Sequence, residues 1–176
     1  MANVETTKFC NLRCRMCVQF LEGATVRGPH MELEHFKEIA QQVFPHVAVW
    51  QPSVAGEPVV TRAFDAMLDL AHEFGLGLHL TTNGTLAPGP IMERVARDRR
   101  DCEFSFDAPT KATFERIRVG AVFETVVSNI QALIKLCRET RGSPGPGFAL
   151  SVTLMRQNIG ELALLDTNPM PEETAR

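Results

Sequence analysis

The chain of 176 residues predicts an α/β fold built on a parallel β-sheet. Two observations favour this fold: short β-rich runs recur along the chain, and segments with helical spacing of apolar residues lie between them. Strands that alternate with helices of this length form right-handed βαβ units, whose strands run parallel. The expected strands are residues 2–7, 47–51, 77–82, 102–106 and 148–154.

The segments between these strands predict amphipathic helices. Apolar residues recur at helical spacing over 32–44, 64–74 and, most regularly, 122–137. Residues 90–98 show a weaker pattern, and the charges from Arg94 to Asp101 indicate a solvated face rather than a binding patch. The glycine- and proline-rich run 142–147 precedes a strand, so we expect only a turn there.

Composition narrows the class of protein. Hydrophobic residues make up 44% of the chain and charged residues 22%, as in an ordinary globular domain. The net charge of −3 gives no reason to expect nucleic acid or an anionic membrane as a partner. No apolar run approaches the roughly 20 residues of a membrane helix, and the N-terminus lacks a basic and then apolar leader. We therefore expect a cytoplasmic protein.

Three cysteines with the spacing C-x3-C-x2-C follow the first strand: Cys10, Cys14 and Cys17. Three thiolates hold three irons of a 4Fe–4S cluster and leave the fourth iron open to a small chelating molecule. Disulfides are disfavoured, because the chain has five cysteines and no secretory leader. A zinc site needs a fourth ligand, for which His30 is the nearest candidate.

A closed electron-transfer cluster is a further alternative. Its fourth ligand would be Cys102 or Cys137. If neither is a ligand, we expect both to be ordinary buried residues, one on a strand and one on a helix.

Polar residues follow the later strands, whose carboxyl ends meet at one edge of a parallel sheet. In the loop 55–58, Gly56 permits a tight turn and Glu57 either favours the helix N-terminus or accepts hydrogen bonds from an ammonium group. Asn83 belongs to an Asn-Gly turn and could also bind a ribose or the substrate. Ser105 and Asp107 share one side of their strand and predict contacts to a ligand hydroxyl, while Phe104 and Phe106 pack under helices. The alternative for Asp107 is a cap on the helix that we expect near Thr110 to Ile117.

In their order along the chain, these stretches resemble the catalytic domain of radical S-adenosylmethionine (SAM) enzymes, closest to the group that carries a C-terminal SPASM extension. The matching stretches span residues 5 to 162: residues 5–7 with 10–17, then 55–58, 82–84, 105–108, 117–120 and 158–162. The resemblance implies a partial (βα)6-type TIM barrel, in which five βα units are present here. Three positions depart from the usual pattern: Ala55 stands in place of a glycine, Met16 stands in place of an aromatic residue before the third cysteine, and Ala108 closes the Ser-x-Asp stretch.

The resemblance also implies the cofactors and their ligands. Cys10, Cys14 and Cys17 would ligate a 4Fe–4S cluster whose open iron binds the amine and carboxylate of SAM. An external donor would reduce the cluster, which cleaves SAM to a 5′-deoxyadenosyl radical that abstracts hydrogen from a small-molecule or peptide substrate. The residues that would contact SAM or substrate are Met16, Gly56, Glu57, Asn83, Ser105, Asp107 and Arg118.

Each of these residues has an implied role. Met16 would pack on adenine, and Gly56 and Glu57 would hold the methionyl amine. Asn83, with Ser105 and Asp107, would contact ribose or substrate. Arg118 would either pair with the SAM carboxylate or form a salt bridge.

The end of the chain departs from the family. Residues 1–165 predict an incomplete radical SAM core without a sixth strand, and 166–176, rich in proline and acidic residues, predict a disordered tail. We therefore expect a C-terminally truncated domain whose fifth strand is covered by a partner or a second copy. The alternative function is a non-catalytic iron–sulfur or SAM-binding remnant.

Overall fold

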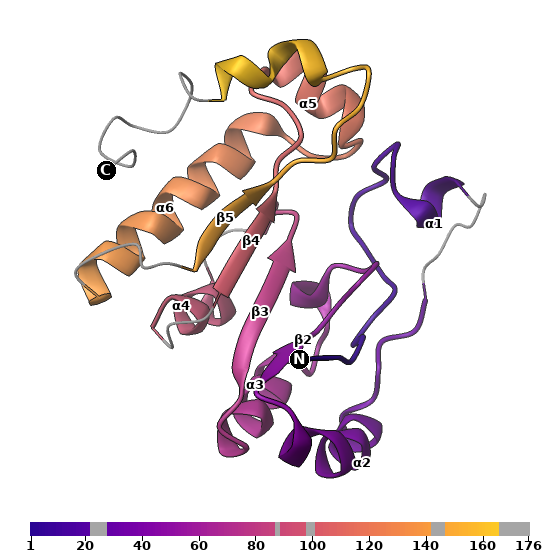
Figure 1. The fold of residues 1–176 in the computed structure, drawn as a ribbon, viewed down its shortest axis with the longest axis vertical. Helices are drawn as coiled ribbons and strands as arrows, with labels where there is room; N and C mark the ends of the chain where they lie inside the picture. Colours follow the sequence, from indigo (N-terminus) through magenta and orange to yellow (C-terminus); the bar gives the residue numbers. More distant parts are fainter. Residues whose placement is uncertain (22–27, 87–88, 98–100, 142–146, 166–176) are drawn as a thin grey trace.

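The computed structural model describes residues 1–21, 28–86, 89–97, 101–141 and 147–165. It contains β1 (Ala2–Asn3), β2 (Val49–Gln51), β3 (Gly77–Thr82), β4 (Asp101–Ser105) and β5 (Phe148–Ser151). All four pairings are parallel, and each strand lies beside its predecessor along the chain (Figure 1). This confirms the predicted α/β fold, with the sequential strand order of a βα barrel that is open between β1 and β5.

Three of the strands are shorter than predicted, and β2 begins two residues later than expected, at Val49. β1 ends at Asn3, although the Val4 and Thr6 N–H groups still donate to Gln51 O (3.1 Å) and Pro52 O (2.8 Å), which extends the parallel contact. β5 ends at Ser151, and the Thr153 N–H beyond it donates to Asp107 Oδ1 at 2.8 Å. A side chain therefore takes the donor that a longer strand would have used for pairing.

The predicted helices are present. They are α2 (Leu33–Val43), α3 (Phe64–Glu73), α4 (Pro90–Arg97), α5 (Lys111–Ile117) and α6 (Phe123–Arg141). The short helix α1 (Val18–Leu21) and the 3-10 turns η1 (Phe44–His46), η2 (Pro58–Val60) and η3 (Ile159–Leu164) complete the described elements. α1 spans a single turn, which is too short to produce a recognisable apolar period.

Burial alternates along the central strands and divides the sheet into two faces. On one face the side chains of β3 and β4 are fully covered by helices, whereas on the other they are polar and half-buried. Phe106 packs against Phe114 and Phe123 with ring centroids 4.9 and 5.8 Å apart, as predicted for a residue under the helices. The polar face carries His79, Thr81, Glu103 and Ser105.

An aromatic cluster holds the first two βα units together. Trp50 on β2 is fully buried, and its ring lies 5.0 Å from Phe36, 5.9 Å from Phe44 and 6.0 Å from Phe64. Its Nε1–H donates to Val4 O at 3.3 Å, which also fastens the chain after β1. This cluster therefore supports the segment that leads into the cysteine loop.

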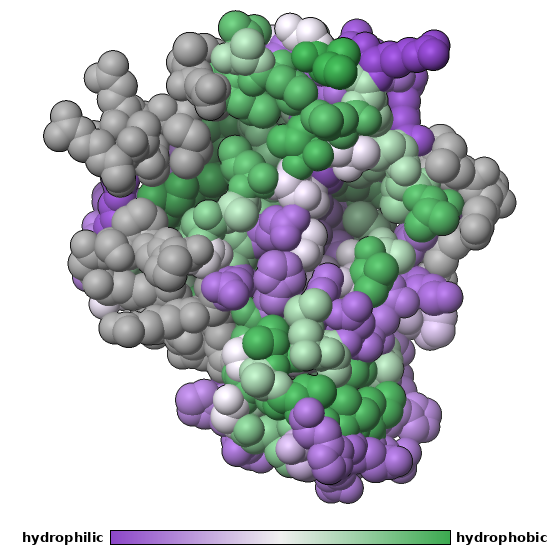
Figure 2. Space-filling view, viewed as in Figure 1, coloured by the Kyte–Doolittle hydropathy of each residue, from purple (hydrophilic) through white to green (hydrophobic). Residues whose placement is uncertain are grey.

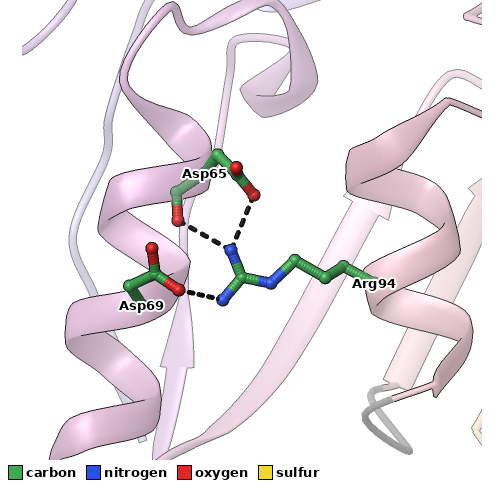
Figure 3. Close-up of polar contacts among 3 residues, drawn as sticks. All are labelled: Asp65, Asp69 and Arg94. Atoms are coloured by element: carbon green, nitrogen blue, oxygen red, sulfur yellow. Dashed lines mark hydrogen bonds and ion pairs between the residues drawn. The ribbon is translucent and has the colours of Figure 1, made fainter.

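Arg94 connects α4 to α3 (Figure 3). Its Nη1 donates to Asp65 Oδ1 at 2.6 Å and to Asp65 O at 3.1 Å, and its Nη2 donates to Asp69 Oδ1. The sequence predicts a solvated charged face that begins at Arg94. In the structure, however, the Arg94 side chain is paired with two aspartates of α3. Residues 98–100 and the predicted turn at 142–146 lie outside the described residues.

The last described strand leaves apolar surface exposed. Among the described residues β5 pairs only with β4, and Leu150 and Leu154 are 39% and 64% exposed. Ile159 and Leu164 of η3 are also exposed, and Figure 2 shows apolar surface where Figure 1 places β5 and η3. The predicted tail 166–176 lies outside the described residues. None of the helices in the described part of the chain has the length and apolarity to cross a membrane.

We predict that Trp50→Ala lowers the free energy of unfolding by about 3–5 kcal/mol, because it leaves a cavity among three aromatic rings and removes the bond to Val4 O. Chemical denaturation followed by circular dichroism measures this. Val54→Ala, at a side chain that is 71% exposed, is the matched control and should change the value by less than about 0.5 kcal/mol. Equal effects of the two substitutions would contradict the assignment of Trp50 to the core.

Candidate functional site

The cysteine loop is held between two other segments by backbone hydrogen bonds. On one side, the Glu57 N–H donates to Phe9 O at 2.8 Å. On the other, the Arg13 and Arg15 N–H groups donate to Val119 O and Ile117 O, both at 2.9 Å. The loop therefore lies between the segment after β2 and the end of α5, at the carboxyl ends of the strands.

Gly56 allows the first of these contacts. A Cβ atom at this position would lie 2.1 Å from Thr7 O and 3.1 Å from Phe9 O, so the backbone beside the cysteine loop leaves no space for a side chain. The predicted tight turn at Gly56 is therefore also a close approach between two backbones. Pro58 opens η2, where its fixed φ suits the first position of a helical turn.

Glu57 is a buried carboxylate that joins two loops. It is 2% exposed, its Oε1 accepts a hydrogen bond from Thr82 Oγ1 at 2.9 Å, and its Oε2 accepts one from the Asn83 N–H at 2.7 Å. Burial raises the pKa of Glu57 to about 7, although the hydrogen bonds from Asn83 and Thr82 oppose this rise. A cation brought near this carboxylate would favour its charged form.

Asn83 faces the cysteine loop. Its Nδ2 lies 3.7 Å from Cys10 Sγ and 2.8 Å from Asn11 Oδ1, and its Oδ1 accepts a hydrogen bond from the Thr85 N–H at 2.9 Å. Gly84 adopts a φ of +70°, which confirms the predicted Asn-Gly turn. The turn thus directs the side-chain amide of Asn83 at a cysteine sulfur.

Asp107 and Arg118 form a buried ion pair beside the loop. Asp107 is 0% and Arg118 6% exposed, and Arg118 Nε lies 2.8 Å from Asp107 Oδ2, at ion-pair distance but without the angles of a hydrogen bond. Arg118 Nη1 lies 3.9 Å from Cys14 Sγ. The salt-bridge alternative for Arg118 is therefore observed. The helix-cap alternative for Asp107 is wrong, because the N-cap residue of α5 is Thr110.

Asn158 connects the Asp107–Arg118 ion pair to the segment after β5 through hydrogen bonds. Its Nδ2 donates to Asp107 O at 2.7 Å and to Thr153 O at 2.8 Å, and its Oδ1 accepts from the Met155 N–H at 2.8 Å. Asn158 is 0% exposed. Asn158 lies in the last matching stretch, just as Asn11 and Thr82, which complete the contacts around Asn83 and Glu57, lie in earlier ones, but none of the three was singled out as a site residue.

The three thiols of the cysteine loop interact with one another. Burial raises the pKa of Cys14 to about 11, an effect that Arg118 opposes and that the charges of Cys10 and Cys17 reinforce. Burial likewise raises the pKa of Cys10. The free thiols of Cys10 and Cys14 therefore stay protonated at neutral pH, whereas coordination to a metal deprotonates a thiol.

Cys102 and Cys137 lie away from this loop. Cys102 is near the beginning of β4, where it pairs with Phe148, whereas the cysteine loop lies at the opposite ends of the strands. Both side chains are buried in the core, as predicted, at 1% and 0% exposure. Among the described residues, no three His, Cys, Asp or Glu side chains are grouped so as to hold a single metal ion.

The other candidate residues have less defined surroundings. Ser105 is half-buried on the polar face of the sheet and pairs in register with Ser151. Met16 is half-buried against the core, within the cysteine loop. His30 forms an isolated antiparallel bridge with Thr7, and its ring lies 5.8 Å from that of Phe9.

Comparison of sequences identifies distant relatives. The chain is 29% identical over 166 residues to the tungsten-containing aldehyde ferredoxin oxidoreductase cofactor-modifying protein of Pyrococcus furiosus, covering 90% of the chain and 45% of that protein. It is 26% identical over 160 residues to mycofactocin maturase MftC of Mycobacterium tuberculosis, covering 90% and 38%. The chain thus spans less than half the length of either relative. No protein-family model matches it.

Solved structures share the fold. SuiB of Streptococcus suis, bound to the precursor peptide SuiA, superposes with a TM-score of 0.73 at 14% identity, covering 94% of the chain and 35% of SuiB. The enzyme anSMEcpe with bound AdoMet superposes with a TM-score of 0.63 at 18% identity, covering 84% and 42%. The distant relatives, the order of the motifs and the shared fold support a radical SAM domain, which confirms the resemblance.

Proposed function

We propose that residues 1–165 form the core of a radical SAM enzyme of the maturase type. Cys10, Cys14 and Cys17 would hold a 4Fe–4S cluster, and SAM would be its second cofactor. The observation that carries this proposal is that the buried Asn83 amide and the buried Arg118 guanidinium reach the sulfurs of Cys10 and Cys14, beside the buried carboxylate of Glu57. Once reduced by an external donor, such a cluster supplies one electron for the cleavage of SAM into a carbon radical.

The donor set of the site suits a thiolate-bound cluster. Cys10 Sγ accepts a hydrogen bond from the Leu12 N–H at 3.4 Å, besides its contact with Asn83. Hydrogen bonds to sulfur stabilise the negative charge that thiolate ligands carry. The three cysteines belong to one short loop that backbone hydrogen bonds hold on both sides, so a cluster with an open iron would need no fourth cysteine.

Glu57 suits the amine of a SAM molecule. Its carboxylate is buried without a cationic side chain in hydrogen-bond contact within the described residues, and its raised pKa reflects that environment. Arrival of an ammonium would favour ionisation and add a charge-assisted hydrogen bond. Gly56 keeps the adjacent backbone close to the cysteine loop, and Arg118 or Met16 would contact other parts of the same ligand.

The substrate would approach the polar face of the sheet, where Ser105 and its neighbours are half-buried. SuiB, whose fold this chain shares, is bound to a precursor peptide, which supports a peptide as the substrate class. A partner or a second copy of the chain would cover the exposed apolar residues Leu150 and Leu154 along β5. The alternative proposal is a remnant that binds the cluster or SAM without turning over.

Anaerobic reconstitution with iron and sulfide tests the cluster and its open iron. We predict a 4Fe–4S EPR signal in the dithionite-reduced protein that shifts when SAM is added, together with formation of 5′-deoxyadenosine. Cys14→Ala should lose the cluster, whereas Cys102→Ala, at the far end of β4, should keep both signals. A signal that does not respond to SAM would support the remnant, and loss of the cluster in Cys102→Ala would indicate a closed four-cysteine site.

The pH dependence of stability tests the environment of Glu57. Because its folded pKa of about 7 exceeds the usual 4.5, the folded protein binds more protons between these values, and its stability falls as the pH rises through this interval. We predict that the difference in unfolding free energy between Glu57→Gln and the wild type shifts by about 2.5 kcal/mol in favour of glutamine from pH 5 to pH 8, both cluster-free. Glutamine also weakens one of the two hydrogen bonds, but that cost is independent of pH. A difference that stays constant would show that Glu57 is not destabilised by its burial.

A further inference from the structure

Two side chains from different loops donate to the sulfurs of the cysteine loop. Asn83 Nδ2, after β3, lies 3.7 Å from Cys10 Sγ. Arg118 Nη1, at the end of α5, lies 3.9 Å from Cys14 Sγ. Both residues are buried, with 6% of Asn83 and 6% of Arg118 exposed, so water competes little for these donors.

The orientation of the Asn83 amide is fixed by a closed ring of hydrogen bonds. Asn83 Nδ2 donates to Asn11 Oδ1 (2.8 Å), Asn11 Nδ2 donates to Thr85 Oγ1 (2.7 Å), and Thr85 Oγ1 donates to Asn83 Oδ1 (2.6 Å). The Thr85 N–H also donates to Asn83 Oδ1 at 2.9 Å, and a backbone N–H cannot accept. Rotating the amide would set its NH₂ against that N–H, so the NH₂ group must face Cys10.

The guanidinium of Arg118 is likewise held in place. Asp107 lies 2.8 Å from its Nε and is in turn fixed by the Thr153 N–H, which donates to Asp107 Oδ1 at 2.8 Å. The planar guanidinium can therefore contact Asp107 with one nitrogen while another points at Cys14. A lysine at this position would carry a single ammonium nitrogen, so it could not contact Asp107 with one nitrogen and Cys14 Sγ with another.

We propose that Asn83 and Arg118 are positioning residues that raise the reduction potential of the cluster through hydrogen bonds to Cys10 and Cys14. The inference rests on the proposed function, namely that these cysteines hold a cluster. A hydrogen bond to a ligand sulfur stabilises the reduced, more negative state of a cluster more than the oxidised state, which makes reduction easier. It gives Asn83 a role other than the contact to ribose or substrate that the family resemblance implies.

The test is a potentiometric titration of the reconstituted protein without SAM, followed by EPR. Asn83→Ala should lower the midpoint potential, because it removes the donor to Cys10. Asn129→Ala is the matched control: Asn129 Nδ2 donates to Gly84 O at 2.9 Å in the same loop but contacts no sulfur, so its potential should equal that of the wild type. Arg118→Lys should also lower the potential while keeping the charge opposite Asp107.

The outcomes separate this inference from the proposed function. A wild type that takes up no cluster overturns both. A wild type with a cluster whose potential is unchanged in Asn83→Ala and Arg118→Lys overturns only the role of these two donors. If Asn83→Ala does not fold, judged by the thermal unfolding of the cluster-free protein, Arg118→Lys alone decides: a lowered potential supports the inference and an unchanged one overturns it.

Discussion

The site depends on a contact between two backbones. At Gly56 the segment after β2 lies so close to Thr7 and Phe9 that a single methyl group would fall within 2.1 Å of a carbonyl oxygen. This approach lets the Glu57 N–H bind Phe9 O and brings the Glu57 carboxylate beneath the turn that carries Asn83. Glycine is required at position 56 because any side chain there would collide with the backbone of Thr7.

The two buried carboxylates near the cysteine loop, Asp107 and Glu57, differ in the groups that surround their charge. Asp107 has Arg118 as a counter-ion, so that this part of the site is electrically balanced in the protein itself. Glu57 has only hydrogen-bond donors in contact with its oxygens among the described residues, and burial makes its ionisation costly. The charge of Asp107 is therefore balanced within the protein, whereas Glu57 suits a cationic ligand.

Much of the fold could be predicted because its strands and helices have clear apolar periods. Trp50, Leu78 and Phe104 fall in short β-rich runs, and α2, α3 and α6 show helical spacing. The cysteines, Gly56, Glu57 and Asn83 were recognisable because their spacing or their place after a strand restricts their chemistry.

What escaped prediction depends on tertiary contacts. No local pattern reveals that Asn11, in the middle of the cysteine loop, closes a ring of hydrogen bonds with Thr85. The end of β5 could not be predicted either, because the Thr153 N–H is taken by Asp107, 46 residues away in the chain. The pairing of Arg118 with Asp107 was left as one of two alternatives, since either partner was compatible with the sequence.

The order of the strands has a consequence for how the protein is made. Each strand pairs with the one synthesised just before it, so the sheet grows in the direction of translation and needs no earlier strand to wait for a distant partner. The cysteine loop differs, because its backbone bonds to Ile117 and Val119 form only after about a hundred further residues have left the ribosome. During that interval the cysteine loop lacks the backbone bonds that hold it on the side of α5.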